Sequence, residues 1–264
     1  MNLIQTTTLA LLQGLTEFLP ISSSGHLILM PIFLGWRDQG LIIDVAVHIG
    51  TLGAVIIYLR HEVWRIISSL VNIRKNHLND GAKLGYLLLI ASLPVFIVGF
   101  IVKFYIGVGI RIPLIIGWSF IIGGMLLYLS DLIGKTKKDL ANFRIVDAIL
   151  IGVAQAFAII PGASRAGITI TMARFLGYKR DEAARISLLL SIPAILGAGV
   201  VLGIEIIESA SPLLIYHVFW GTTVAFITAM FAISIMMSWL KQNNYTPFVI
   251  YRICLGIVIL WFAA

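Results

Sequence analysis

Six long apolar runs, separated by short loops, constrain this chain more than any other feature. The runs cover about residues 42–59, 84–102, 113–130, 186–203, 213–236 and 246–263. Each is close to the roughly 20 residues that a helix needs to cross a bilayer. Because 59% of the residues are hydrophobic and only 12% are charged, the composition lies far outside the soluble range. The sequence therefore predicts an all-α polytopic membrane protein with a single membrane domain, residues 1–264.

The basic residues of the chain indicate membrane orientation rather than nucleic-acid binding. A formal net charge of +7 would suggest nucleic acid as the partner of a soluble protein, but here most Lys and Arg residues lie in short loops between apolar runs, where they set topology. Residues 60–83 are basic and amphipathic, which predicts a helix at the membrane surface. Cys254 is the single cysteine, so no internal disulfide can form. The N-terminus lacks a basic segment, so we expect no cleavable signal peptide.

The stretch Gln13 to His26, QGLTEFLPISSSGH, places polar groups inside an apolar run. We predict a helix over residues 3–19, which Pro20 ends by removing a backbone donor. Ser22, Ser23 and Ser24 are natural N-cap residues for a second helix, although such serines can also be caps without any further role. A helix broken at membrane depth is tolerated only around a buried site or cavity. A carboxylate such as Glu17 is expensive in lipid and normally functional.

The second half of the chain repeats this motif at an offset of 142 residues. Gln155 then corresponds to Gln13, Ser164 to Ser22, and Arg165 to Ser23. The order of elements repeats as well, because each broken helix is followed by three apolar runs. The sequence therefore predicts an internal duplication, with residues 1–130 as the first repeat and 144–264 as the second, each a re-entrant helix hairpin plus three transmembrane helices.

Three full spans per half would leave the second repeat inverted relative to the first, as in many transporters. Loop charge indicates the same topology. Loops 60–83, 131–144 and 174–185, together with Lys241, hold 14 Lys and Arg residues, whereas the opposite side holds 3. By the positive-inside tendency, the first set is cytoplasmic and both termini lie outside. The two hairpin tips are then expected to meet inside the bundle.

The meeting tips predict an anion site. Two helix N-termini, at Ser22 and Ser164, would direct backbone N–H groups and partial positive charge at one volume, and the Arg165 fork suits phosphate oxygens. In the absence of ligand, Arg165 should pair with Glu17, since an unpaired cation is costly in lipid. The residues predicted to bind substrate are Gln13, Ser22, Ser164, Arg165 and Thr169.

Several of these groups indicate that the ligand reacts. Ser23 and His26 are three residues apart and share a helix face, which offers a nucleophile beside an acid or base. Glu17 could hold Mg²⁺ or Ca²⁺ together with phosphate oxygens. The polar pair Asp44 and His48, four residues apart in an apolar run, is compatible with either a structural pair or a catalytic role.

The run Gln13 to His26, together with Pro161 to Gly167, PGASRAG, resembles the two signature motifs of the undecaprenyl-diphosphate phosphatases, also called bacitracin-resistance proteins. The resemblance covers the whole chain in length and hydropathy. It implies a multi-pass hydrolase of the inner (plasma) membrane that converts undecaprenyl diphosphate to undecaprenyl phosphate plus phosphate. This reaction recycles the lipid carrier for cell-wall polymers and confers bacitracin resistance.

The resemblance also implies a divalent metal ion and an active site that opens toward the outer, periplasmic face. The family's glutamate-rich motif maps onto Gln13 and Glu17 as metal ligands. The predicted catalytic residues are Glu17, Ser23, His26 and Arg165. Two departures stand out: Gln13 occupies a position where many members carry a second glutamate, and Ala166 one where a serine is common.

Other interpretations remain open at this stage. Inverted repeats and broken helices equally allow a transporter or flippase of an anionic polyprenyl lipid. A non-catalytic membrane scaffold would leave a buried Glu17 and Arg165 unexplained. The sequence does not decide whether the nucleophile is Ser23, His26 or a metal-bound water. It also leaves open the metal, the prenyl length and the oligomeric state.

Overall fold

The computed structural model describes residues 2–72, 79–105, 112–206 and 212–263. These residues are mainly helical, and their only β-type pairing is an isolated bridge between Lys138 and Tyr178. The α-helices are α1 (Leu3–Thr16), α2 (Ser23–Leu34), α3 (Leu41–Tyr58), α4 (Arg60–Val71), α5 (Asp80–Tyr105), α6 (Pro113–Ile133), α7 (Ile145–Ala156), α8 (Arg165–Phe175), α9 (Arg180–Ile206), α10 (Pro212–Leu240) and α11 (Thr246–Ala263). Two short 3₁₀ helices are η1 (Leu140–Asn142) and η2 (Phe157–Ile159). The predicted all-α class is confirmed.

Five helices in the described part of the chain are long and apolar enough to cross a membrane: Leu41–Tyr58, Asp80–Val102, Pro113–Ile133, Leu213–Leu240 and Thr246–Ala263. They match five of the predicted runs, and the remaining run, 186–203, lies within α9. Large apolar side chains face outward, including Phe100, Phe219 and Phe231, each at least 65% exposed. Water would disfavour such a surface, whereas lipid would not. The protein is therefore a multi-pass membrane protein.

The first motif forms a hairpin of two short helices. α1 ends at Thr16, earlier than the predicted end at residue 19, and a turn over residues 17–21 leads to α2. Proline restrains the residue before it from helical geometry, which accounts for a break ahead of Pro20. Ser22 caps α2, since its hydroxyl accepts a hydrogen bond from the Gly25 N–H (3.4 Å).

The second motif forms a matching hairpin of α7, η2 and α8. Ser164 caps α8 and accepts a hydrogen bond from the Gly167 N–H (3.0 Å). The chain closes on itself at the far end of this hairpin, where the Lys138 N–H donates to the Gly177 carbonyl (3.0 Å). The segments before α7 and after α8 therefore lie together, as a re-entrant hairpin requires.

The two hairpins open toward opposite ends of the molecule. Asn2 and Gln39, which flank the first hairpin, line one cavity. α3 begins beside this opening and leads into α4, whose Arg65 lines another cavity with Asp139 and Glu182, next to the second opening. α3 thus runs from one opening to the other.

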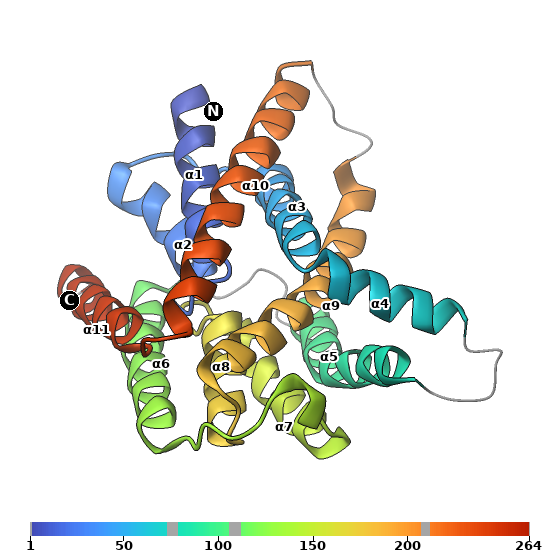
Figure 1. The fold of residues 1–264 in the computed structure, drawn as a ribbon. Helices are drawn as coiled ribbons and strands as arrows, with labels where there is room; N and C mark the ends of the chain where they lie inside the picture. Colours follow the sequence, from blue (N-terminus) through green and yellow to red (C-terminus); the bar gives the residue numbers. More distant parts are fainter. Residues whose placement is uncertain (1, 73–78, 106–111, 207–211, 264) are drawn as a thin grey trace.

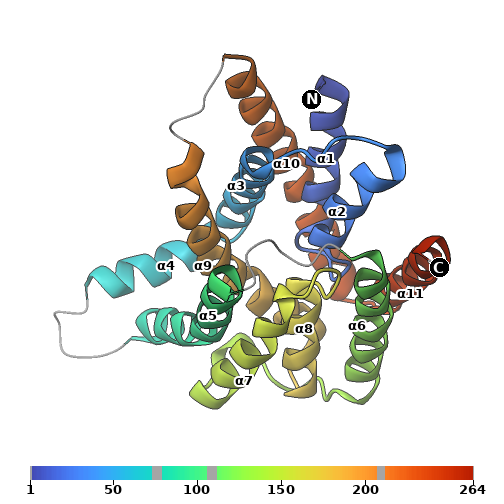
Figure 2. The same cartoon turned by 180° about the vertical axis from the view of Figure 1, so that it is seen from behind.

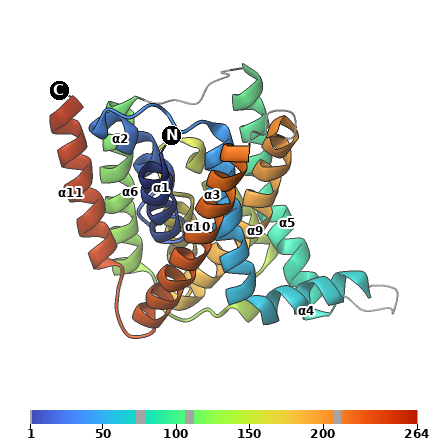
Figure 3. The same cartoon turned by 90° about the horizontal axis from the view of Figure 1, so that it is seen from above.

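The predicted surface helix is present as α4, although residues 73–78 of the basic segment lie outside the described residues. Figure 3 shows α4 lying across the direction of α3, α6 and α11. The α6–α7 and α10–α11 connections lie at the same end as α4, and the α2–α3 connection and the C-terminus lie at the other. This grouping agrees with the loop sets derived from charge.

The two predicted halves interlock. α10 packs on α1 and α3, and α5 packs on α7 (Figure 1). α6 and α11 lie side by side in both views (Figures 1 and 2). A pair of repeats related by a two-fold axis would produce such reciprocal packing, because α1 and α7, like α5 and α10, occupy equivalent places in their halves. The division into repeats 1–130 and 144–264 and their inverted relation stay predictions.

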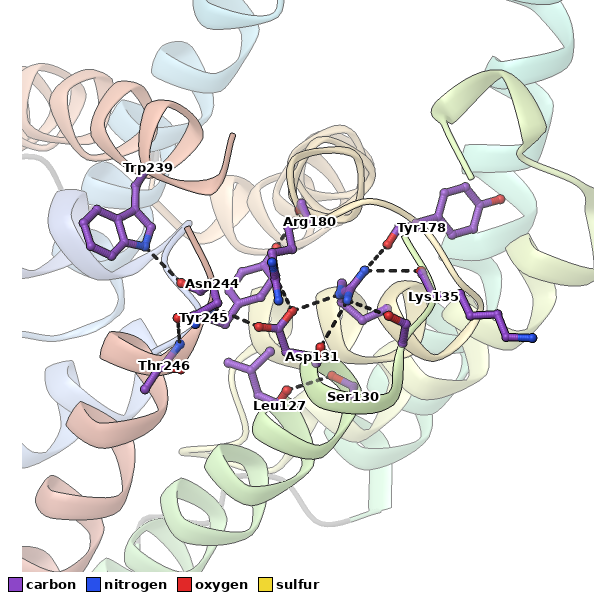
Figure 4. Close-up of polar contacts among 12 residues, drawn as sticks. Leu127, Ser130, Asp131, Lys135, Tyr178, Arg180, Trp239, Asn244, Tyr245 and Thr246 are labelled. Atoms are coloured by element: carbon purple, nitrogen blue, oxygen red, sulfur yellow. Dashed lines mark hydrogen bonds and ion pairs between the residues drawn. The ribbon is translucent and has the colours of Figure 1, made fainter. Parts of the chain in front are cut away.

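A buried polar cluster joins several helix ends where the second hairpin opens (Figure 4). Asp131 accepts hydrogen bonds from Arg174 Nε (3.1 Å), Arg180 Nε (2.7 Å) and the Tyr245 N–H (3.2 Å). Arg174 also donates to backbone carbonyls, among them that of Gly134 (2.9 Å). Counting Arg174 among loop charges was wrong, because its side chain is fully buried and α8 extends through it.

Candidate active site

Glu17 stands at the C-terminal end of α1, where the first helix breaks, and is only 7% exposed. Its Oε2 accepts hydrogen bonds from Ser23 Oγ (2.6 Å) and Gln13 Nε2 (2.9 Å). Its Oε1 accepts one from Arg165 Nη2 (3.0 Å). The four residues come from both hairpins, so the structure confirms that the two tips meet and that Glu17 pairs with Arg165.

Arg165 is the first residue of α8. Besides the ion pair with Glu17, its Nη1 donates to the Ser187 carbonyl in α9 (3.2 Å). The guanidinium is thereby oriented from two sides, which holds its planar fork in one direction.

Both helix N-termini at the tips have the same unusual backbone. Ser22 (φ 72°, ψ 92°) and Ser164 (φ 69°, ψ 109°) are the non-glycine residues with positive φ among those described. Such geometry is sparsely populated by side-chain-bearing residues and recurs at functional sites. Both serines line one cavity, so the start of α2 and the start of α8 meet there, and the N–H groups at helix N-termini favour an anion.

The cavity has a volume of about 420 Å³. Its polar lining comes from the two tips, through Glu17, Ser22, Ser23, Ser24, Ser164 and Arg165, and from Asp44 and His48 in α3. Its apolar walls include Leu41 and Val45 near the start of α3, and Val95 and Ala194 in α5 and α9. A charged floor below apolar walls suits a ligand that carries an anionic head on an apolar chain.

His26 lies away from this cavity, contrary to the expected pairing with Ser23. Its Nδ1 is 2.6 Å from the Ser22 carbonyl, and its Nε2 is 2.5 Å from the Tyr251 hydroxyl in α11, whose ring stacks on the imidazole. Ser23, the first residue of α2, instead turns back to Glu17. Ser23 and His26 are both in α2, as predicted, but their side chains do not contact each other, because each side chain meets a different neighbour.

His48 is the imidazole that the structure places in the cavity. Its Nδ1 lies 2.6 Å from the backbone carbonyl of Asp44, and its Nε2 lies 3.7 Å from Glu17 Oε2. The Asp44 carboxylate accepts a hydrogen bond from Gln39 Nε2 (2.8 Å). The Asp44 and His48 pair was compatible with either a structural or a catalytic role. The position of His48 in the cavity favours a role in the site.

Thr169, which was predicted to bind substrate, and Gln155, the counterpart of Gln13 in the second repeat, lie elsewhere. Thr169 is fully buried, with Oγ1 2.8 Å from Ser187 Oγ and 2.9 Å from the Arg165 carbonyl oxygen, and it does not line the cavity. Gln155 donates to the Ala91 carbonyl in α5 (3.4 Å). Helical spacing predicts the face of the helix on which each side chain lies, but it does not predict which neighbouring helix packs against that face.

The oxygen donors at the tips could hold a hard cation. Glu17 supplies a carboxylate, and the buried Gln13 Oε1 has no hydrogen-bond partner in the described part of the protein. Among the described residues no group of three or more His, Cys, Asp or Glu side chains could hold a metal ion. A cation held here would have Gln13 and Glu17 as its protein oxygen donors and would need its remaining ligands from water or phosphate.

Sequence reasoning missed one residue at the tips, Arg252 in α11. Its fully buried side chain donates hydrogen bonds to carbonyls of both hairpins. An arginine inside an apolar run is the same signal that identified Glu17.

Comparison with known proteins places the chain in a family. Residues 6–258 match the family described as Bacitracin resistance protein BacA. The chain is 46% identical to the undecaprenyl-diphosphatase of Jannaschia sp. (strain CCS1), over 98% of each protein. It is 42% identical to that of Alteromonas mediterranea over 99% of each, and 44% identical to that of Alcanivorax borkumensis over 100% of each. This chain belongs to the bacitracin resistance protein BacA family.

Proposed function

We propose that this protein is a membrane phosphatase that hydrolyses undecaprenyl diphosphate to undecaprenyl phosphate and inorganic phosphate. Its family and its relatives, which are named undecaprenyl-diphosphatases, support this reaction. The observation that carries the proposal is the contact of Ser23 and Arg165 with one buried carboxylate, Glu17, at the floor of the cavity. The site thus combines a hydroxyl, a base and a phosphate-binding cation. Such hydrolysis would recycle the lipid carrier for cell-wall synthesis and confer the resistance for which the family is named.

Substrate binding is proposed to use positive charge from both tips. The Arg165 fork and the N–H groups that begin α2 and α8 would bind the diphosphate oxygens. The apolar walls, which include Leu41 and Val95, would contact the start of the prenyl chain. The guanidinium would exchange part of its contact with Glu17 for the phosphate, which frees the carboxylate to accept a proton.

The chemical step is proposed to begin at Ser23. Its Oγ attacks the terminal phosphorus, the bond to the bridging oxygen breaks, and undecaprenyl phosphate leaves. The Ser23 proton passes to Glu17 along the 2.6 Å hydrogen bond that already joins them. Water then attacks the phosphorus of the phosphoserine, the bond to Ser23 Oγ breaks, Oγ takes back the proton from Glu17, and phosphate is released with one proton to solvent. This geometry favours Ser23 over His26 as the nucleophile, since His26 is engaged with Tyr251.

Glu17 and Gln13 are proposed to hold a divalent cation, Mg²⁺ or Ca²⁺. Bound there with the substrate, the cation would neutralise charge on the phosphate oxygens. Gln13 is suited to this through the unpartnered amide oxygen noted above.

We place the protein in the inner (plasma) membrane with the cavity open to the periplasm. The cavity is lined by the start of α3, beside the opening of the first hairpin, and the basic loops lie at the other end. In a Cys254→Ser background, a cysteine at Arg37 should react with an impermeant label from outside and one at Lys137 only from inside. Labelling of both from the same side would contradict this placement.

The decisive experiment measures phosphate release from a long-chain prenyl diphosphate by the purified protein in detergent. We expect turnover that chelation abolishes and that Mg²⁺ or Ca²⁺ restores. The Glu17→Gln variant, purified identically, controls for contaminating phosphatases. A transporter or scaffold would release no phosphate under any of these conditions. Turnover that persists in excess chelator would contradict the proposed role of a divalent cation.

A further inference from the structure

Arg252 contacts both hairpin tips but does not line the cavity. It lies two turns into α11, and its side chain is fully buried. Tyr251, its neighbour in α11, holds His26 of the first hairpin. α11 thus contacts the site region without contributing to the cavity lining.

The guanidinium of Arg252 donates hydrogen bonds to five backbone carbonyls. Three of them belong to the breaks in the hairpins: Pro20 (3.2 Å), Gly162 (3.1 Å) and Ala163 (3.0 Å). The other two, Ser119 (3.0 Å) and Phe120 (3.2 Å), belong to α6. Carbonyls at a helix break lack intrahelical partners, and lipid offers none. One side chain therefore satisfies acceptors from both broken helices.

The surrounding helices leave a space shaped for this guanidinium. A Cβ on Gly167 in α8 would lie 2.5 Å from Arg252 Nη1, and a Cβ on Gly123 in α6 would clash with Nη2. Neither position can carry a side chain while Arg252 keeps its place. The two glycines therefore leave a space that the Arg252 guanidinium fills.

We propose that Arg252 is a positioning residue that holds the two tips in register for the reaction. This inference rests on the proposed phosphatase function. Pro20 lies between Glu17 and Ser23, and Gly162 and Ala163 directly precede Ser164. A shift of either bonded carbonyl would move the Ser23–Glu17 contact relative to Arg165. A displacement of about 1 Å at reacting groups can lower the rate by about 10²-fold.

Arg174 is the matched control, because it is an equally buried arginine that lies where the second hairpin opens, away from the tips. It too donates to backbone carbonyls, including those of Gly134 and Lys135, but it contacts neither tip. A purely structural role for buried arginines predicts the same consequences at both positions.

The test compares Arg252→Lys with Arg174→Lys. A lysine keeps the charge but cannot bridge five acceptors in two directions. For Arg252→Lys we expect kcat to fall by about 10- to 100-fold, whereas for Arg174→Lys we expect a lower thermal midpoint with kcat of the folded protein near wild type. The effects of Arg252→Lys and Arg165→Lys on the logarithm of kcat should be less than additive in the double variant. Once the tips are out of register, the Arg165 guanidinium contributes less to the reaction, so its replacement costs less. Wild-type kcat in Arg252→Lys, equal kcat losses in both single variants, or strict additivity would overturn the proposal.

A second variant keeps the test informative if Arg252→Lys does not fold. Gly123→Ala leaves Arg252 in the chain but forces its guanidinium to move, whereas Gly99→Ala adds a methyl group where nothing lies within 4 Å. We expect kcat to fall in the first and not in the second, and equal kcat values would overturn the proposal. The wild-type enzyme is measured in the same assay, so an inactive wild type would instead contradict the phosphatase function itself.

Discussion

The two hairpins share a backbone design but carry opposite chemistry. Each breaks in the membrane and restarts at a serine with positive φ. The hydroxyl of that serine caps the second helix by accepting a hydrogen bond from the backbone N–H three residues later. After the cap, the first hairpin presents the Ser23 hydroxyl and the second presents the Arg165 guanidinium. At the tip, only the first hairpin has a carboxylate, Glu17, since Ile159 is at the corresponding place in the second. The comparison teaches that one backbone design brings two helix N-termini to the same cavity, and that the proposed function divides their side chains into a reacting half, with Ser23 and Glu17, and a binding half, with Arg165.

The largest effect should follow removal of the charge in the reacting half. In Glu17→Gln we expect kcat to fall by about 10³-fold or more, because the base for Ser23 is lost. Circular dichroism should show a folded protein. Near-normal phosphate release would mean that the first hairpin does not supply the base.

Ser23→Ala should come next, with an expected loss in kcat of about 10²- to 10³-fold, because the proposed nucleophile is replaced by an inert methyl group. Ser24→Ala, one residue further along α2, serves as the control and should stay within a few-fold of wild type. Equal and small losses at both serines would reduce them to capping residues.

Arg165→Lys tests the binding half. We expect it to fold with a thermal midpoint near wild type and to lose about 10²-fold in kcat/KM, because a lysine point charge is a poor substitute for a planar fork. Arg165→Ala should also lose about 3 to 5 kcal/mol of stability, because the buried Glu17 is left unpaired. A lysine variant with normal turnover would make Arg165 an architectural residue.

The smallest effects should come from the two caps, and these should be alike. Ser22→Gly and Ser164→Gly each lose a capping hydroxyl while relieving the positive φ, so we expect changes in unfolding free energy below about 1 kcal/mol. Thermal unfolding of the two variants measures this directly. A large change at one cap and none at the other would show that the shared backbone is not a shared design.

Much of the fold follows from local chemistry along the chain. The spanning helices follow from the lengths of the apolar runs, and the breaks follow from Pro20 and from capping at Ser22 and Ser164. Glu17 and Arg165 stood out because an ionised group in lipid needs a partner, and each is the other's partner. These features depend on near neighbours or on the cost of charge in lipid, both of which can be read from sequence.

The tertiary structure decided which neighbour each side chain meets. Periodicity placed Ser23 and His26 on one face of α2, but only packing against α11 turns His26 to Tyr251 and leaves His48 beside Glu17. In the same way, only packing shows that Arg252 reaches both hairpin breaks. The physical reason is that the sequence determines what a helix needs to satisfy, whereas the helix rotations and contacts that satisfy it are set by the whole bundle.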